Sequence, residues 1–135
     1  MKIKIMSIQD LLRIPHLKSS FKHAIIFITT NPNYYDFGCT RFLHLNIADT
    51  DAPTIRDYEF QRLYYFAKTE SKTFETIYVC CDAGLSRSPA VALYIAYVQY
   101  MNNTLHDSVN INDILEKYRF LNKSLFEKLK RLSKW

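Results

Sequence analysis

Residues 76–93 read Thr-Ile-Tyr-Val-Cys-Cys-Asp-Ala-Gly-Leu-Ser-Arg-Ser-Pro-Ala-Val-Ala-Leu, and this stretch decides the fold. Its first five residues are apolar, β-branched or aromatic for the most part, which is typical of a central parallel strand covered on both faces. The run after Pro89 is apolar almost all round and predicts a buried helix that continues to about Met101. A tight loop that begins with Cys81 and runs into Arg87 must join the two elements.

The loop has the features that phosphate binding requires. Gly84 allows a sharp turn and a close backbone approach, and Pro89 suits the first turn of a helix, where its missing N–H has no cost. A loop that wraps into a helix N-terminus points several N–H groups at one spot, which binds anions and lowers the pKa of a cysteine placed there. Arg87 adds a planar guanidinium that can hold two phosphate oxygens at once. The expected phosphate-binding residues are Asp82, Ala83, Gly84, Leu85, Ser86 and Arg87.

The ten residues from Cys81 to Ala90 resemble the active-site loop of the cysteine-dependent protein tyrosine phosphatase superfamily, and most closely that of the compact dual-specificity phosphatases. The resemblance implies a phosphomonoester hydrolase in which Cys81 forms a cysteinyl-phosphate intermediate without a cofactor. A cysteine and an arginine at this spacing are a weak signal alone. The preceding strand, Gly84, the Ser88 that follows Arg87 and the helix entry make the motif specific. The alternative is a buried structural cysteine beside an unrelated turn.

Phosphate transfer to the cysteine also needs a proton for the departing oxygen. The segment Leu45-Asn-Ile-Ala-Asp-Thr-Asp-Ala-Pro follows another expected strand. Asp49 best matches the general acid of the dual-specificity phosphatases, and Asp51 is the runner-up. Either could instead cap the next helix, whereas Asp57 should already lie within it. Ser88 is expected to donate its hydroxyl to the sulfur when water attacks the intermediate, although serine is also common at helix N-termini.

The chain departs from the family pattern at Cys80, where these enzymes usually have a histidine. Cys80 is expected to be a small buried residue that ends the strand. An alternative is that Cys80 or Cys39 reacts with oxidised Cys81 and protects it from further oxidation. Tyr118-Arg-Phe-Leu-Asn-Lys-Ser-Leu resembles the segment before the last helix of the family, in which Asn122 either supports the site or caps that helix.

The order of elements predicts a single α/β domain over residues 1–135, with a mostly parallel central sheet and helices on both faces. Ligands of such folds bind beyond the carboxyl ends of the strands. The expected strands are 2–6, 24–29, 42–47 and 76–80. Three helices are expected before the C-terminal region: one that starts at Ser7, one at 54–69 and the one after the loop. Two more are expected near the C-terminus. The first of these carries Ile111, Ile114, Leu115 and Tyr118, and the second carries Leu121, Leu125, Leu129 and Leu132.

Composition sets the broad class of the protein. The chain of 135 residues is 48% hydrophobic and 15% aromatic, as is typical of a globular domain. No apolar stretch approaches the roughly 20 residues that a membrane span needs. Two of the three cysteines are adjacent, which favours a reducing, cytoplasmic setting. The four histidines have no zinc-like spacing, so no metal is expected.

The remaining question at this stage is the substrate. The net charge is +5, and basic residues near the C-terminus form either a solvated helix face or an attraction for anionic partners. No RNA-binding signature is present, so no nucleic-acid partner is expected. A phosphorylated protein or peptide is the expected substrate, with phosphotyrosine foremost. Lipid or RNA 5′-phosphates are an alternative that Asp82 disfavours by its charge. Two other functions are alternatives to a phosphatase. One is a phosphopeptide-binding module without catalysis, and the other is a rhodanese-like or redox protein.

Overall fold

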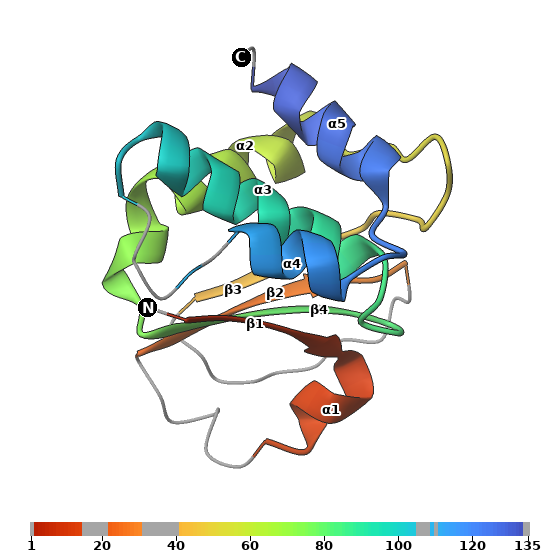
Figure 1. The fold of residues 1–135 in the computed structure, drawn as a ribbon, viewed down its shortest axis with the longest axis horizontal. Helices are drawn as coiled ribbons and strands as arrows, with labels where there is room; N and C mark the ends of the chain where they lie inside the picture. The colour runs from red at the N-terminus through yellow and green to blue at the C-terminus, as the bar shows by residue number, and fades with distance from the viewer. Residues whose placement is uncertain (1, 15–21, 31–40, 105–108, 110, 134–135) are drawn as a thin grey trace.

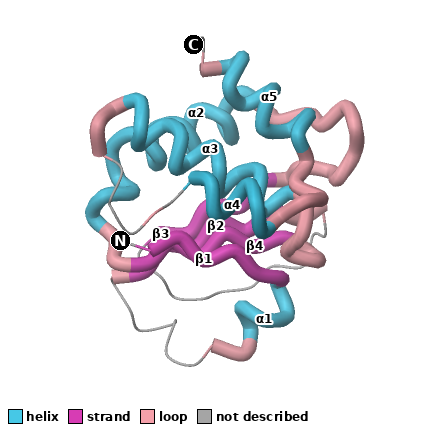
Figure 2. The backbone as a smooth tube through the Cα atoms, in the orientation of Figure 1, coloured by secondary structure: helices cyan, strands magenta, loops and turns pink. Residues whose placement is uncertain are grey.

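The computed structural model describes residues 2–14, 22–30, 41–104, 109 and 111–133. Within these residues, four parallel strands form one sheet in the order β1-β4-β2-β3 (Figures 1 and 2). Their bounds are Lys2–Ser7 for β1, His23–Ile28 for β2, Arg41–Leu45 for β3 and Thr76–Cys81 for β4. β4 lies inside the sheet and all six of its residues are buried, which confirms the prediction from its apolar run.

Helices cover both faces of the sheet, as expected for an α/β protein. The helix α1 (Ile8–Leu12) lies on one face, and α2 (Asp57–Tyr65), α3 (Arg87–Met101), α4 (Ile111–Lys117) and α5 (Lys123–Leu132) lie on the other (Figure 1). Successive side chains of a strand point to opposite faces. Thus Val79 and Cys81 pack in the core under α2, α3, α4 and α5, whereas Tyr78 and Cys80 pack with Leu11 of α1.

Several element boundaries differ by one to three residues from the sequence-based expectation. The helix expected at 54–69 begins only at Asp57, and its last turn, Phe66–Glu70, is π-helical. Pro53 is buried and Ile55 packs against the core, so this part of the chain is extended along the surface before the helix starts. The strand expected at 42–47 ends at Leu45, and β4 continues through Cys81. Cys39 lies outside the described residues.

The parallel sheet brings the carboxyl ends of its strands to one edge, where α/β proteins bind ligands. Ser7 ends β1, Thr29 follows β2, Asn46 follows β3, and Cys81 ends β4. The two segments that the sequence singled out, at 46–51 and 81–87, therefore leave the sheet at the same edge. No helix among the described residues is long and apolar enough to cross a membrane.

Candidate active site

Cys81 ends β4, directly before the loop that leads into α3, and its side chain is buried. The backbone N–H of Gly84 donates to Cys81 Sγ over 3.2 Å. Ser88 Oγ lies 3.1 Å from the same sulfur, and Ser88 is itself fully buried. The sulfur therefore has two hydrogen-bonding neighbours, either of which can stabilise a thiolate as a donor.

Gly84 gives the loop its shape. Its φ is +73°, in the region that favours glycine. A Cβ at this position would lie 2.5 Å from Ser7 N and 2.6 Å from the carbonyl carbon of Met6, and both are backbone atoms at the end of β1. No other residue fits without moving either the loop or the edge strand, so the curvature around Cys81 depends on this glycine.

Arg87 begins α3 and holds its guanidinium beneath the loop, where only 8% of the side chain is exposed. Nη1 donates to the carbonyl oxygen of Ile47 over 2.9 Å. Nη2 donates to Asp82 Oδ2 over 2.9 Å. Nε is buried and has no hydrogen-bond partner among the described residues. A buried donor without a partner is costly, by about 1–3 kcal/mol, and an anionic ligand over the loop would supply one.

Asp82 follows the cysteine and is more exposed than the arginine with which it pairs. Its side chain is 56% exposed, and Thr29 Oγ1 donates to Asp82 Oδ1 over 3.1 Å. The end of β2 therefore orients this carboxylate toward Arg87. An acid at this position lowers the positive charge that the loop presents to an anion.

Asp49 lies against the loop, whereas Asp51 does not contact it through any hydrogen bond found among the described residues. Asp49 Oδ1 accepts from Ser86 Oγ over 2.8 Å and from Asn122 Nδ2 over 3.0 Å. Both bonds fall on the same oxygen, so Oδ2 is left for another partner. Neither aspartate caps α2, because the N-cap residue is Arg56 and no side chain bonds there.

Asn122 joins three parts of the site. Its Oδ1 accepts from the N–H of Leu125 and so caps α5, over 3.0 Å. Its Nδ2 donates to Asp49 and to the carbonyl of Thr50, each over 3.0 Å. Its own N–H donates to the carbonyl of Ser86 over 3.0 Å. The sequence left support of the site and helix capping as alternatives, and the structure shows that one side chain does both.

Cys80 is separated from the candidate site by the strand itself. Its side chain is fully buried on the α1 face, opposite to that of Cys81. Burial raises the pKa of the Cys80 thiol well above its ordinary value, and the neighbouring Cys81 adds to the shift. The structure therefore favours the prediction that Cys80 is a small buried residue and gives no support to Cys80 as a thiol that protects Cys81.

Glu59 is a supporting residue that the sequence analysis missed. It lies on α2 and is 3% exposed, and its Oε2 accepts from the N–H of Asn46 over 2.6 Å. This bond fixes the chain next to Ile47, whose carbonyl holds Arg87. The sequence contains a signal that Glu59 is buried, because this residue lies four positions before Leu63 and therefore on the apolar side of α2.

The fold of the chain is similar to that of solved dual-specificity and tyrosine phosphatases. In the described part of the chain, no group of histidine, cysteine, aspartate and glutamate residues could hold a metal ion.

Particular solved structures show the likeness. DUSP15 is 21% identical with a TM-score of 0.61, over 96% of this chain and 88% of that one. OH1, a tyrosine phosphatase of the Orf virus, is 21% identical with a TM-score of 0.55, over 95% and 79%. The PTP-2 phosphatase of Cydia pomonella is 16% identical with a TM-score of 0.59, over 96% and 83%. The sequence matches no protein-family model, and the curated proteins contain no match to it.

Proposed function

We propose that this protein is a cysteine-dependent phosphatase that hydrolyses phosphomonoesters of proteins or peptides. The observation that carries the proposal is the loop around Cys81, in which the sulfur accepts a backbone N–H and the buried Arg87 Nε has no hydrogen-bond partner in the described part of the chain. These groups suit a phosphate whose oxygens are held while the sulfur attacks phosphorus. Structures with the same fold are described as tyrosine phosphatases, which supports the substrate class.

In the first step, the Cys81 thiolate attacks phosphorus and the bond from phosphorus to the leaving oxygen breaks. Asp49 gives its proton to that oxygen, so the alcohol or phenol leaves neutral. Its position supports this role, because Ser86 and Asn122 orient the carboxyl group through Oδ1 alone. Arg87 and the loop N–H groups stabilise the charge on the three equatorial oxygens.

In the second step, water attacks the cysteinyl-phosphate, and the sulfur–phosphorus bond breaks. Asp49, now ionised, accepts the proton of the water. The sulfur leaves as a thiolate, and Ser88 donates its hydroxyl to it across the short separation of 3.1 Å. Inorganic phosphate and the free enzyme are the products.

The proposal is tested by the hydrolysis of an aryl phosphate in the presence of a chelator, with wild type compared to Cys81→Ser. We expect the wild type to release phosphate and the variant to release none. Activity that disappears on addition of chelator alone, or that persists in Cys81→Ser, would contradict the mechanism. A wild type that binds phosphopeptide but releases no phosphate would favour a binding module.

The choice of Asp49 over Asp51 is tested with two leaving groups. Loss of a general acid slows an ester with a poor leaving group more than one with a good leaving group. Asp49→Asn should therefore slow phenyl phosphate more than p-nitrophenyl phosphate, and Asp51→Asn should slow both equally or neither. The reverse result would assign the role to Asp51.

Lipid and RNA 5′-phosphates are the main alternative substrates. The ion pair between Asp82 and Arg87 argues against them, because it offsets the only arginine in the loop. A densely charged substrate gains most from a strongly cationic loop. Phosphate release measured with phosphopeptides, phosphoinositides and 5′-triphosphate RNA separates these classes.

A further inference from the structure

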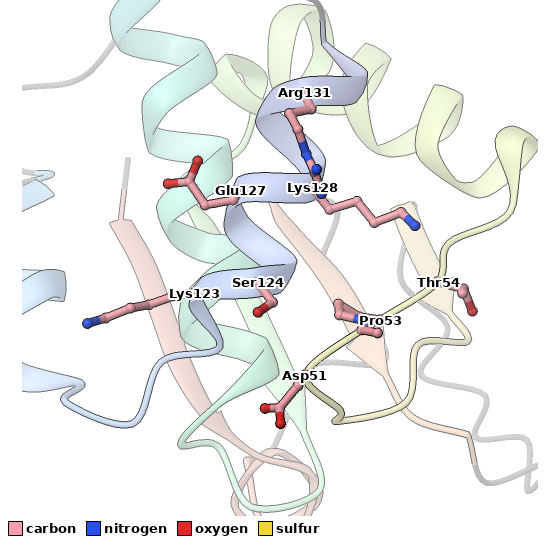
Figure 3. Close-up of a pocket in the computed structure, with 9 residues that line it drawn as sticks. Asp51, Pro53, Thr54, Lys123, Ser124, Glu127, Lys128 and Arg131 are labelled. Carbon is pink, nitrogen blue, oxygen red and sulfur yellow. The ribbon is translucent and has the colours of Figure 1, made fainter.

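A groove extends from the candidate active site along α5. Its volume is about 670 Å³, and its walls are the chain at 51–54 and one side of α5 (Figure 3). A smaller hollow of about 390 Å³ contains Asp49 and Ser86 of the site. The two hollows share Asp51, Lys123 and Ser124, so the groove adjoins the hollow that contains Asp49 and Ser86.

Three cations line the groove without a carboxylate partner. Lys123, Lys128 and Arg131 all come from α5, and none of them forms an ion pair with another described residue. Figure 3 shows Lys128 extending across toward the chain at Pro53 and Thr54. The remaining basic residue of the helix is different, because Lys130 pairs with Glu127 at 3.8 Å and lies over the rings of Tyr97 and Phe126, on another side of the helix.

Lys123 occupies a position that helix stability disfavours. It is the first residue of α5, and the first turn contains no acidic residue. The positive end of the helix dipole lies here, where a carboxylate would stabilise the helix and a lysine does not. A lysine at this point adds to the positive charge of the helix end, which favours the binding of an anion there.

The charge of the groove is mixed, which limits what it can bind. Asp51 and Glu127 also line the groove, and Glu127 is paired with Lys130. Asp51 would repel a polymer with a charge at every unit, and none of the described residues that line the groove has an aromatic ring on which a base could stack. A polypeptide with separated acidic groups can meet the cations and avoid the carboxylates.

We propose that this groove binds acidic or phosphorylated residues that flank the target residue in a substrate polypeptide. The proposal rests on the proposed function, since it concerns the same substrate. Lys128 and Arg131 would select the flanking sequence, while the loop around Cys81 would act on the phosphate. Lys123 lies between the two regions, where the hollows meet.

The test uses two phosphopeptides that differ only in their flanking residues, glutamate in one and glutamine in the other. The double variant Lys128→Gln/Arg131→Gln is compared with Arg62→Gln/Lys72→Gln, which removes two exposed charges outside the groove. We expect wild type to prefer the acidic peptide in kcat/KM, and the groove variant to lose about fivefold of that preference, as for two exposed ion pairs. The preference should also weaken in high salt.

Two further measurements separate this proposal from the proposed function. Hydrolysis of a small aryl phosphate, which does not reach the groove, should be unchanged in both double variants. Fluorescence anisotropy with a labelled, unphosphorylated acidic peptide reports groove binding even if the protein has no phosphatase activity. An unchanged peptide preference in the groove variant would overturn the proposal. So would a groove variant that keeps peptide binding but loses binding to single-stranded RNA or to anionic vesicles.

Discussion

Replacement of Asp82 by asparagine should make the site bind inorganic phosphate more tightly and make the ligand-free protein less stable. In the ligand-free protein, the Asp82 carboxylate accepts from Arg87 Nη2 at 2.9 Å. A bound phosphate would compete for the same guanidinium. Asparagine keeps the shape of the side chain and can still accept from Thr29 Oγ1, so the main loss is the charge that faces Arg87.

The size of both effects follows from the exposure of the two partners. Arg87 is 8% exposed, but Asp82 is 56% exposed, so solvent screens the pair. A value of about 1 kcal/mol is appropriate for such an interaction. The dissociation constant for phosphate should therefore fall about fivefold. Without ligand, the same loss should lower the melting temperature by about 3–5 °C for a chain of 135 residues.

Thermal unfolding at a series of phosphate concentrations measures both quantities, because a ligand that binds only the folded state stabilises it by RT ln(1 + c/Kd), where c is the free ligand concentration. Asp51→Asn is the matched control, since it removes a nearby charge that does not contact Arg87 in any bond between described residues. Phosphate affinity that is unchanged or lower in Asp82→Asn would refute the reasoning. That result would mean that Asp82 orients the arginine and does not compete for it.

Three other substitutions test the site. Ser88→Ala should slow the release of phosphate from the cysteinyl intermediate by about tenfold or more, which is the loss expected for a hydrogen bond to a charged group. Rapid-mixing kinetics would then show a burst of aryl alcohol. The absence of any burst or rate change would contradict the role of Ser88. Gly84→Ala should abolish phosphate binding, because the added methyl meets the backbone of Ser7, and retained binding in a calorimetric titration would contradict this. Asn122→Ala should lower the free energy of unfolding by about 1–2 kcal/mol. Asn122→Asp should restore the helix cap but not the activity on phenyl phosphate, since a carboxylate cannot donate to Asp49. Equal activity in wild type and Asn122→Asp would exclude the positioning role of Asn122.

The stretch at 76–93 could be predicted from sequence because its signals are local. An apolar run, a glycine and a proline each restrict the backbone within a few residues, and the described β4 and α3 follow those restrictions closely. The start of the helix expected at 54–69 was predicted three residues too early. Pro53 and Ile55 are positioned by packing against the core, and no local sequence pattern indicates that packing. The sequence left two roles open for Asn122, helix capping and support of the site, because its partners Ser86 and Asp49 are 36 and 73 residues away in the chain.

The sequence alone was sufficient to name the cysteine, the arginine and the two candidate acids, because each belongs to a short segment with its own pattern. Only the tertiary structure shows that the two aspartates differ in their contacts, since both lie in one loop and only Asp49 has hydrogen bonds to Ser86 and Asn122 among the described residues. It also placed Cys80 on the opposite face from Cys81, paired Asp82 with Arg87, and set the groove on α5 beside the hollow that contains Asp49 and Ser86. These relations depend on the sheet order and on helix packing, which bring together groups that the chain keeps far apart.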